Sequence, residues 1–148
     1  MSVPDVDLEL RWTPDAAFLA PIARGLGDFN DTAVGRARKR WFALRAQAPH
    51  GRVTGGLSGW LMGGWLYVDW LWVAEEARGQ DMGTRLLQSA EALARTEGMR
   101  YAQLFTASWQ ALSFYRKQGY EVLAEWPLDM PDSPGTFSHR EYLLKKTL

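Results

Sequence analysis

The stretch from Trp65 to Val73 limits the possible folds of this chain more than any other part of its sequence. It is apolar at odd and even positions alike, and Asp69 is the only charged residue in it. Such a run predicts a central β-strand that is covered on both faces. Two alternating runs, Arg40–Ala46 and Val53–Leu61, precede it, and turn residues separate the three. We therefore expect an antiparallel meander of three strands in the middle of the chain.

The spacing of apolar residues changes from strand-like to helical after Val73. Leucines and alanines at positions 86, 87, 90, 93 and 94 form a helical stripe that closes at Gly98. The remaining segments predict a strand at Tyr101–Thr106, a helix at Ala111–Gln118, a strand at Tyr120–Trp126, a loop at Pro127–Ser138 and a strand at Arg140–Leu144. A strand–helix–strand crossover is parallel and right-handed. The prediction is an α+β fold with one mixed, mostly antiparallel sheet that splays at a central parallel strand pair, with helices on both faces.

The N-terminal part predicts one strand and one helix. Val6–Trp12 alternates apolar and polar residues, which is typical of a half-buried strand. Thr13-Pro14-Asp15 predicts a helix start, with a capping hydroxyl and a proline in the first turn. We expect this helix to end near Gly25 or Gly27, and a short second helix is one reading of residues 28–35. A length of 148 residues predicts a single domain, 1–148.

Composition excludes several classes of function. Seventeen basic residues balance seventeen acidic ones, so we expect no nucleic-acid partner and no anionic membrane surface. The absence of cysteine and the presence of only two histidines argue against a metal site. The first residues lack the layout of a signal peptide, and no apolar run approaches the ~20 residues of a membrane span. We expect a cytoplasmic location.

The segment from Arg78 to Thr84 is the first candidate for chemistry. It follows the central strand and opens a helix, so its free backbone N–H groups could hold an anion. Glycines would let a phosphate approach the backbone closely. The alternative is a turn in which Asp81 caps its own helix. The second candidate runs from Ser108 to Tyr120, where Tyr115 is either a packed ring or a general acid.

Together, the two segments resemble the GNAT superfamily of acetyl-CoA-dependent N-acetyltransferases. The family pattern Arg/Gln-x-x-Gly-x-Gly/Ala is matched by Arg78-Gly79-Gln80-x-x-Gly83. The pattern Asn-x-x-Ala-x-x-x-Tyr-x-x-x-Gly-Phe/Tyr is matched by Ser108-x-x-Ala111-x-x-x-Tyr115-x-x-x-Gly119-Tyr120, except that Ser108 replaces the asparagine. The predicted order of elements also agrees with that fold. The resemblance implies acetyl transfer from acetyl-CoA, as co-substrate, to a primary amine.

The resemblance also implies a role for each matching residue. The backbone of Trp72 and Val73 would bind the pantetheine arm, and Tyr115 would lie beside the thioester sulfur as general acid. The residues expected to bind the cofactor are Trp72, Val73, Arg78, Gly79, Gln80, Asp81, Met82, Gly83, Thr84, Ser108 and Ala111. Asp81 replaces a family glycine and would place a carboxylate beside the pyrophosphate.

The acceptor side has fewer signals. Asp69 is expected to share a strand face with Tyr67, Leu71 and Val73. It is a candidate general base or amine anchor, and the alternatives are a salt bridge or a solvated edge of the cleft. The tryptophans are expected in the core, although Trp60, Trp65, Trp70 or Trp109 could wall an aromatic acceptor pocket. His139 is a possible proton acceptor or a surface residue.

Two other functions remain open at this stage. One is a catalytically degenerate module that binds an acyl-CoA, which Asp81 would favour. The other is a protein-interaction module on the same fold, with the tryptophans as its surface. A homodimer is possible in each case, and the sequence does not identify the amine acceptor.

Overall fold

The computed structural model describes residues 6–36, 38–133 and 138–148. The chain divides into two compact units, Met1–Ala37 and Arg38–Leu148, and each is considered by itself. The sequence predicts a frayed end up to about Asp5, and residues 1–5 lie outside the described residues. The prediction of a single domain over 1–148 stays a prediction.

The first unit contains one helix, α1 (Ala16–Val34). Its N-cap is Asp15, whose side chain accepts a hydrogen bond from the Phe18 backbone N–H at 2.8 Å, so the expected capping hydroxyl of Thr13 was wrong. The helix continues through Gly25 and Gly27, because glycine weakens a helix without blocking its hydrogen bonds. It ends at Gly35, where φ is +72°. Residues 28–34 therefore belong to the same helix and not to a second one.

The expected strand at Val6–Trp12 was wrong. The described residues 6–12 form no strand, and Val6, Leu8, Leu10 and Trp12 are all exposed. Alternation of apolar and polar residues marks a strand only where a neighbouring strand supplies hydrogen bonds, and these residues pair with none in the part of the chain that is described.

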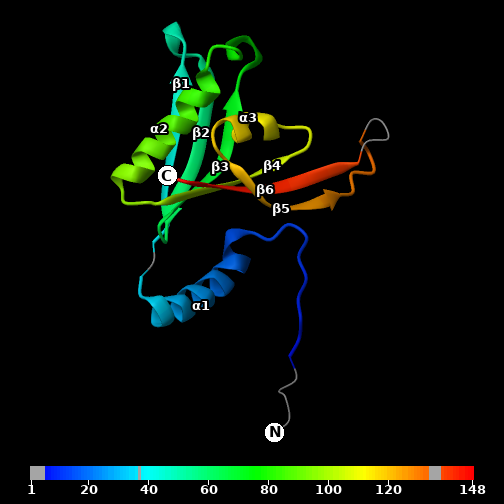
Figure 1. Cartoon of the computed structure of the whole chain (residues 1–148). Helices are drawn as coiled ribbons and strands as arrows, with labels where there is room; N and C mark the ends of the chain where they lie inside the picture. Colours follow the sequence, from blue (N-terminus) through cyan, green and yellow to red (C-terminus); the bar gives the residue numbers. More distant parts are fainter. Residues whose placement is uncertain (1–5, 37, 134–137) are drawn as a thin grey trace. The chain divides into compact units, whose positions relative to one another are not determined.

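The second unit is built on a six-stranded sheet (Figure 1). Its strands are β1 (Arg40–Gln47), β2 (Val53–Met62), β3 (Trp65–Val73), β4 (Tyr101–Ala107), β5 (Glu121–Leu128) and β6 (His139–Thr147), in the order β1-β2-β3-β4-β6-β5. Every neighbouring pair is antiparallel except β3 with β4. The predicted meander, the parallel pair and the α+β class are confirmed. The expected loop begins later than Pro127, which belongs to the edge strand β5. An edge strand tolerates the missing N–H of a proline. Residues 134–137 of the expected loop lie outside the described residues.

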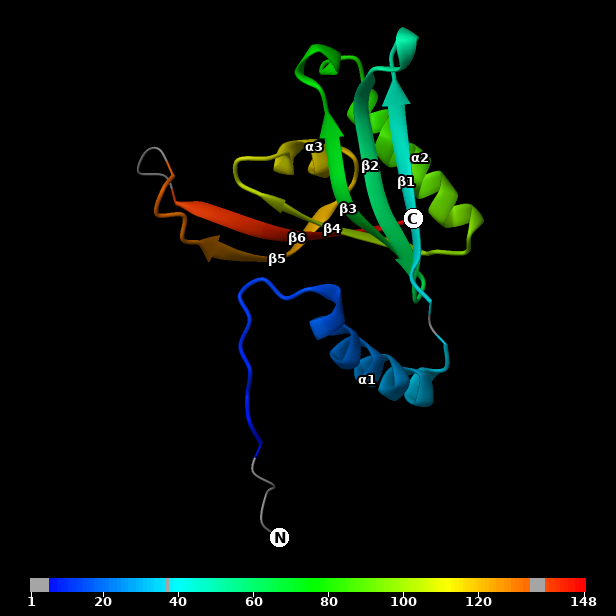
Figure 2. The same cartoon turned by 180° about the vertical axis from the view of Figure 1, so that it is seen from behind.

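Helices α2 (Met82–Thr96) and α3 (Leu112–Lys117) cover the same face of this sheet. Both lie in front of the strands in Figure 1 and behind them in Figure 2. Apolar side chains of α2 and Tyr115 of α3 join those of β2, β3, β4 and β6 in one buried cluster. We call this face of the sheet the inner face and the opposite one the outer face.

A buried carboxylate ties α2 to β6. Glu91 is only 2% exposed and accepts hydrogen bonds from Lys146 Nζ at 2.8 and 3.0 Å. The Tyr120 hydroxyl donates a third bond at 3.2 Å. Burial, and then the neighbouring Glu91 charge, raises the pKa of Tyr120. A charge removed from water in this way is tolerated because it is paired and hydrogen-bonded.

A β-bulge at Asp69 reverses the side-chain pattern of β3. Ser58 pairs with Trp70 and Gly59 with Val68, so Asp69 is an extra residue in the ladder. Before it, Tyr67 stacks on Trp60 on the outer face. After it, Leu71 and Val73 pack against the inner cluster. The expectation that Tyr67, Asp69, Leu71 and Val73 share one face was therefore wrong.

The bulge also marks the point where the sheet splays. Parallel pairing of β3 with β4 stops at Val68 and Leu104. Beyond it, the edge of β3 that faces β4 pairs with no strand among the described residues. Trp70 and Trp72 then lie on the outer face and are exposed, so the expectation that both faces of this strand are covered fails at its C-terminal end.

Candidate active site

A cleft of about 590 Å³ lies at the open end of β3. Its walls are the last residues of β3, the loop into α2, the first turn of α2, and the β4–α3 turn with α3. The lining residues are Leu71, Trp72, Val73, Ala77, Arg78, Gly79, Asp81, Met82, Gly83, Thr84, Trp109, Gln110, Ala111, Phe114 and Tyr115.

The start of α2 gives the cleft the character of an anion site. The first N–H groups of a helix have no partner within the helix, and the helix dipole makes this end positive. The chain enters α2 through left-handed backbone at Gly79, with φ of +73°, and at Asp81, with φ of +56°. Gly83 lies in the first turn of α2, where a Cβ would lie 3.4 Å from the Phe114 ring, at ordinary contact distance. Backbone and glycine together therefore leave the end of this helix open to a ligand.

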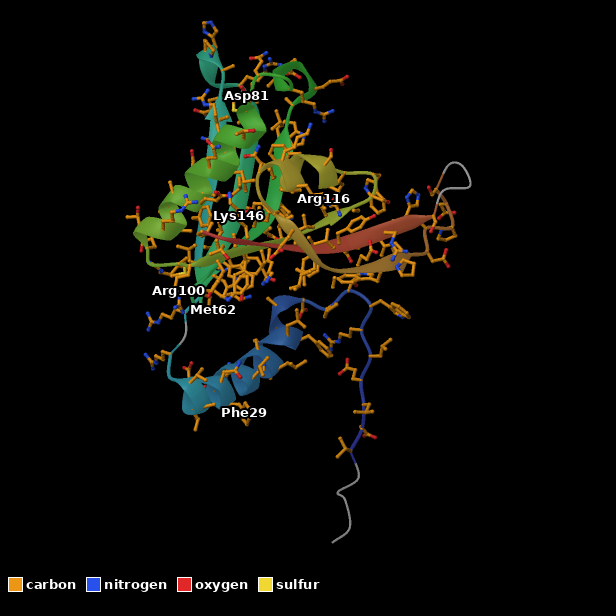
Figure 3. The ribbon with its side chains drawn as sticks, in the orientation of Figure 1. Phe29, Met62, Asp81, Arg100, Arg116 and Lys146 are labelled. Carbon is orange, nitrogen blue, oxygen red and sulfur yellow. The ribbon has the colours of Figure 1, made fainter. Side chains whose placement is uncertain are left out.

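The alternative in which the Asp81 side chain caps its own helix is not found in the structure. Asp81 occupies the N-cap position of α2, as Figure 3 shows, but its side chain forms no capping hydrogen bond. Asp81 is instead one of the residues that line the cleft. The residue therefore adopts the left-handed conformation that glycine would adopt more easily, and it brings a negative charge into a site that otherwise favours anions.

The loop between β3 and α2 is held by its own side chains. The Arg78 Nε donates to the Val73 carbonyl oxygen at 3.2 Å, beside the open edge of β3. The Gln80 amide donates to the Glu76 carbonyl at 3.3 Å, and Glu76 forms an ion pair with Arg52 at 2.6 Å. Gln80 is not among the residues that line the cleft. Its contact with Glu76 indicates a role in holding the loop.

Tyr115 lies where the cleft meets a second cavity. This splay cavity, of about 210 Å³, opens between β3 and β4, and its lining includes Asp69, Thr106 and Tyr115. The tyrosine is only 7% exposed, and burial raises its pKa from 10.0 to about 12. Its hydroxyl therefore stays protonated at neutral pH and can act as a proton donor.

The sequence from residue 37 to residue 122 matches the family described as acetyltransferase (GNAT) domain. The chain belongs to the GNAT acetyltransferases. A blasticidin-S acetyltransferase of Streptomyces morookaense is 43% identical to this acetyltransferase over 99 residues, which are 66% of this chain and 71% of the relative.

Solved structures of acetyltransferases share the fold. One, named as an acetyltransferase of Agrobacterium tumefaciens, superposes with a TM-score of 0.84 at 29% identity, covering 97% of this chain and 100% of its own. Another, named as a streptothricin acetyltransferase of Bacillus anthracis in complex with acetyl coenzyme A, gives a TM-score of 0.61 at 18% identity and covers 78% of this chain and 65% of its own.

Most of the predicted site residues of this acetyltransferase gather around the two cavities. Ten of them line the cleft, and Asp69 lines the splay cavity with Tyr115. Gln80 and Ser108 do not line either one. The Ser108 hydroxyl accepts a hydrogen bond from the Arg140 backbone N–H at 3.1 Å, so it joins β4 to β6. Its predicted contact with the cofactor stays a prediction.

Sequence reasoning missed several lining residues of the acetyltransferase. Gln110 lines both cavities, and its side-chain oxygen accepts the Ala107 backbone N–H at 2.9 Å, which fixes the turn before α3. The sequence did contain a signal for Gln110, because an amide side chain just before a short helix can bond to the backbone of the preceding turn. Phe114 could have been found from Gly83, since a motif glycine in a helix implies a close neighbour.

His139 and Trp109 lie together near the cleft. The His139 Nε2 is 2.6 Å from the Ser133 hydroxyl, and its ring packs edge-on to Trp109 with centroids 5.0 Å apart. Both line a further cavity, and Trp109 lines the cleft as well. Among residues 6–36, 38–133 and 138–148, no group of three histidine, aspartate or glutamate side chains is placed to hold a metal ion. None of the described helices is both long enough and apolar enough to cross a bilayer.

Proposed function

We propose that this GNAT acetyltransferase moves the acetyl group of acetyl-CoA to a primary amine of a small, antibiotic-like molecule by direct attack. The observation that carries the proposal is the meeting of two cavities at Tyr115. The cleft is suited to the long pantetheine arm of acetyl-CoA and the phosphates at its end. The other lies between β3 and β4, and Asp69 is among its lining residues.

The cleft suits acetyl-CoA for three reasons. The edge of β3 beyond Val68 is open toward β4, so the amides of a pantetheine arm can pair with it as an added strand does. The start of α2 offers free N–H groups to the pyrophosphate. Arg78 adds a positive charge to the lining, and its guanidinium would shift from the Val73 carbonyl toward the phosphates.

The chemistry follows from the two side chains at the junction. The amine nitrogen attacks the carbonyl carbon of the acetyl group, and the carbon–sulfur bond breaks. Tyr115 gives its proton to the departing thiolate, and Asp69 takes the proton that the amine loses, directly or through water. The backbone N–H of Val73 would stabilise the oxyanion. Holding both substrates at one junction supplies much of the rate.

The acceptor class is suggested by the relatives. The curated relative at 43% identity is named for blasticidin S, and a structure of the same fold is named for streptothricin. We therefore choose blasticidin S as the first acceptor to test. A cytoplasmic location and a homodimer stay predictions from the sequence.

The test combines binding with turnover. Calorimetry with acetyl-CoA tests the cleft, and release of free thiol in the presence of blasticidin S tests transfer. We expect micromolar binding of acetyl-CoA and thiol release that depends on the acceptor. Acetyl-CoA binding without transfer to blasticidin S or a broad amine panel would favour the degenerate module, which the carboxylate of Asp81 in the cleft supports as the second candidate.

A further inference from the structure

Large aromatic side chains flank the outer mouth of the splay cavity. Trp70 of β3 is 73% exposed and Phe105 of β4 is 56% exposed, and both line this cavity. Trp126 of β5 packs edge-on against Phe105, with ring centroids 6.0 Å apart. The cavity that Trp70 and Phe105 line also reaches Tyr115, and Trp126 extends the aromatic surface beside Phe105. Exposed apolar groups clustered at a cavity mouth are typical of ligand sites.

Two carboxylates accompany these rings. Asp69 lines the splay cavity itself. Glu141 accepts a hydrogen bond from the Trp126 indole N–H at 2.9 Å, and the two residues are direct partners across β5 and β6. Direct partners in a sheet lie on the same face, so Glu141 also belongs to the outer face. The mouth therefore combines aromatic faces with negative charge, and both attract a cation.

The size of the cavity limits what can enter it. About 210 Å³ is below the 300–1,000 Å³ that is usual for pockets holding a whole drug-sized ligand. It can take an amino group and its nearest atoms. The body of the acceptor must then lie at the mouth, where Trp70 and Phe105 offer flat apolar surfaces.

We propose that the acceptor of this enzyme is a flat aromatic or heteroaromatic molecule whose primary amine arrives as a cation. The inference rests on the proposed function, since it assigns the acceptor class of the same site. The ring stacks on the aromatic side chains at the mouth, and the ammonium group enters the splay cavity toward Asp69. Asp69 holds the charged amine, which gives one proton to water before the attack. Asp69 then takes the second proton, which the nitrogen loses as the amide bond forms and the carbon–sulfur bond breaks.

The outer face also provides a matched control. Trp41 of β1 is 62% exposed on the same face, and its ring lies 4.7 Å from that of Trp60. Lys39 Nζ already lies over the Trp60 ring, 4.6 Å from its centroid. Trp41 lines neither the cleft nor the splay cavity. Replacing it by leucine removes an exposed indole without touching the proposed site.

The experiment measures binding with three simple probes. Benzylamine is flat and cationic, cyclohexylmethylamine is cationic but puckered, and benzyl alcohol is flat but uncharged. Dissociation constants come from NMR titration of the full chain in the presence of CoA. We expect benzylamine to bind about threefold to tenfold more tightly than either of the other probes.

The variants assign each preference to a residue. Trp70→Leu should remove the preference over cyclohexylmethylamine, and Asp69→Asn should remove the preference over benzyl alcohol. Trp41→Leu should leave both preferences unchanged. If Trp70→Leu fails to give a cooperative melting curve, Phe105→Leu takes its place. Equal binding of benzylamine and cyclohexylmethylamine by the wild-type protein overturns the proposal, as does a preference that survives in Trp70→Leu.

Thiol release from acetyl-CoA separates this inference from the proposed function. Ring-selective binding without turnover of any amine would leave the inference standing and remove the enzymatic function. Turnover of aliphatic and aromatic amines with the same kcat/KM would support the enzymatic function and overturn the inference about the acceptor.

Discussion

Replacing Asp81 by glycine should strengthen the binding of CoA. Asp81 lines the cleft at the start of α2, and its side chain forms no capping hydrogen bond. Two unit charges about 4 Å apart repel by about 1 kcal/mol in water and by more when partly desolvated. Removing the charge should therefore lower the Kd of acetyl-CoA about fivefold.

The same change should not destabilise the protein. No capping hydrogen bond is lost, and glycine relieves the left-handed backbone at φ +56°, which costs an ordinary residue about 1–2 kcal/mol. Glycine also raises the entropy of the unfolded chain, which costs about 0.4–1 kcal/mol. The two nearly offset each other, so the melting temperature without ligand should stay level or rise slightly.

Calorimetry and melting curves of three variants separate charge from backbone. Asp81→Asn keeps a residue that tolerates left-handed backbone and removes only the charge, so it should reproduce the gain in affinity. Asp81→Ala should gain affinity and lose stability. Raising the salt concentration should narrow the difference between wild type and Asp81→Asn. Unchanged affinity in Asp81→Asn would refute the argument, because it would place the carboxylate away from the pyrophosphate.

Four further predictions concern residues described above. Tyr115→Phe should lower kcat about 100-fold and leave the Kd of acetyl-CoA unchanged, and equal kcat would make Tyr115 a packing residue only. Asp69→Asn should shift the pH–rate profile or raise KM for the amine; if neither changes, Asp69 lies outside the reaction. Because burial raises the pKa of Tyr115 from 10.0 to about 12, its contribution to the free energy of unfolding is complete below pH 10 and is lost as the pH rises toward about 12. Melting curves over this pH range should show a smaller loss of stability in Tyr115→Phe than in the wild type, and the difference should be at most about 3 kcal/mol. Lys146→Met removes the cation nearest to the buried Glu91 and leaves it Arg95, at 3.5 Å, and the Tyr120 hydroxyl, so it should cost about 3 kcal/mol in chemical denaturation. Lys145→Met, which breaks the exposed pair with Glu121, should cost under about 1 kcal/mol, and equal costs would contradict the burial argument.

The order of elements from Arg40 onward could be predicted because it rests on periodicity, which local sequence carries directly. The apolar run at Trp65–Val73, the stripe of the following helix and the glycines that close it all gave the correct element. The parallel pairing of β3 with β4 followed from a general rule about crossovers. Val6–Trp12 shows the limit, since alternation says nothing about whether a neighbouring strand exists.

The candidate site was predictable where residues close together in the sequence determine its backbone. The loop from Arg78 to Gly83 is built by neighbouring residues, so a motif was enough to locate it. Asp69 was found, but its surroundings were not, because one extra residue in a ladder leaves no mark in composition or spacing. Gln110 and Phe114 line the cleft through contacts with other elements, and such contacts are not visible in a single sequence.

The bulge at Asp69 decides which side chains of β3 face the cleft. Deleting Asp69 would close the bulge without moving any remaining side chain to the other face, because Val68 already pairs with Gly59 and Trp70 with Ser58. Straightening the strand with Asp69 kept would instead shift the pairing by one residue and turn Leu71 and Val73 to the outer face. The indoles of Trp70 and Trp72 would then point into the apolar interior, so the strand can lose a residue at the bulge but cannot lose the bulge at constant length.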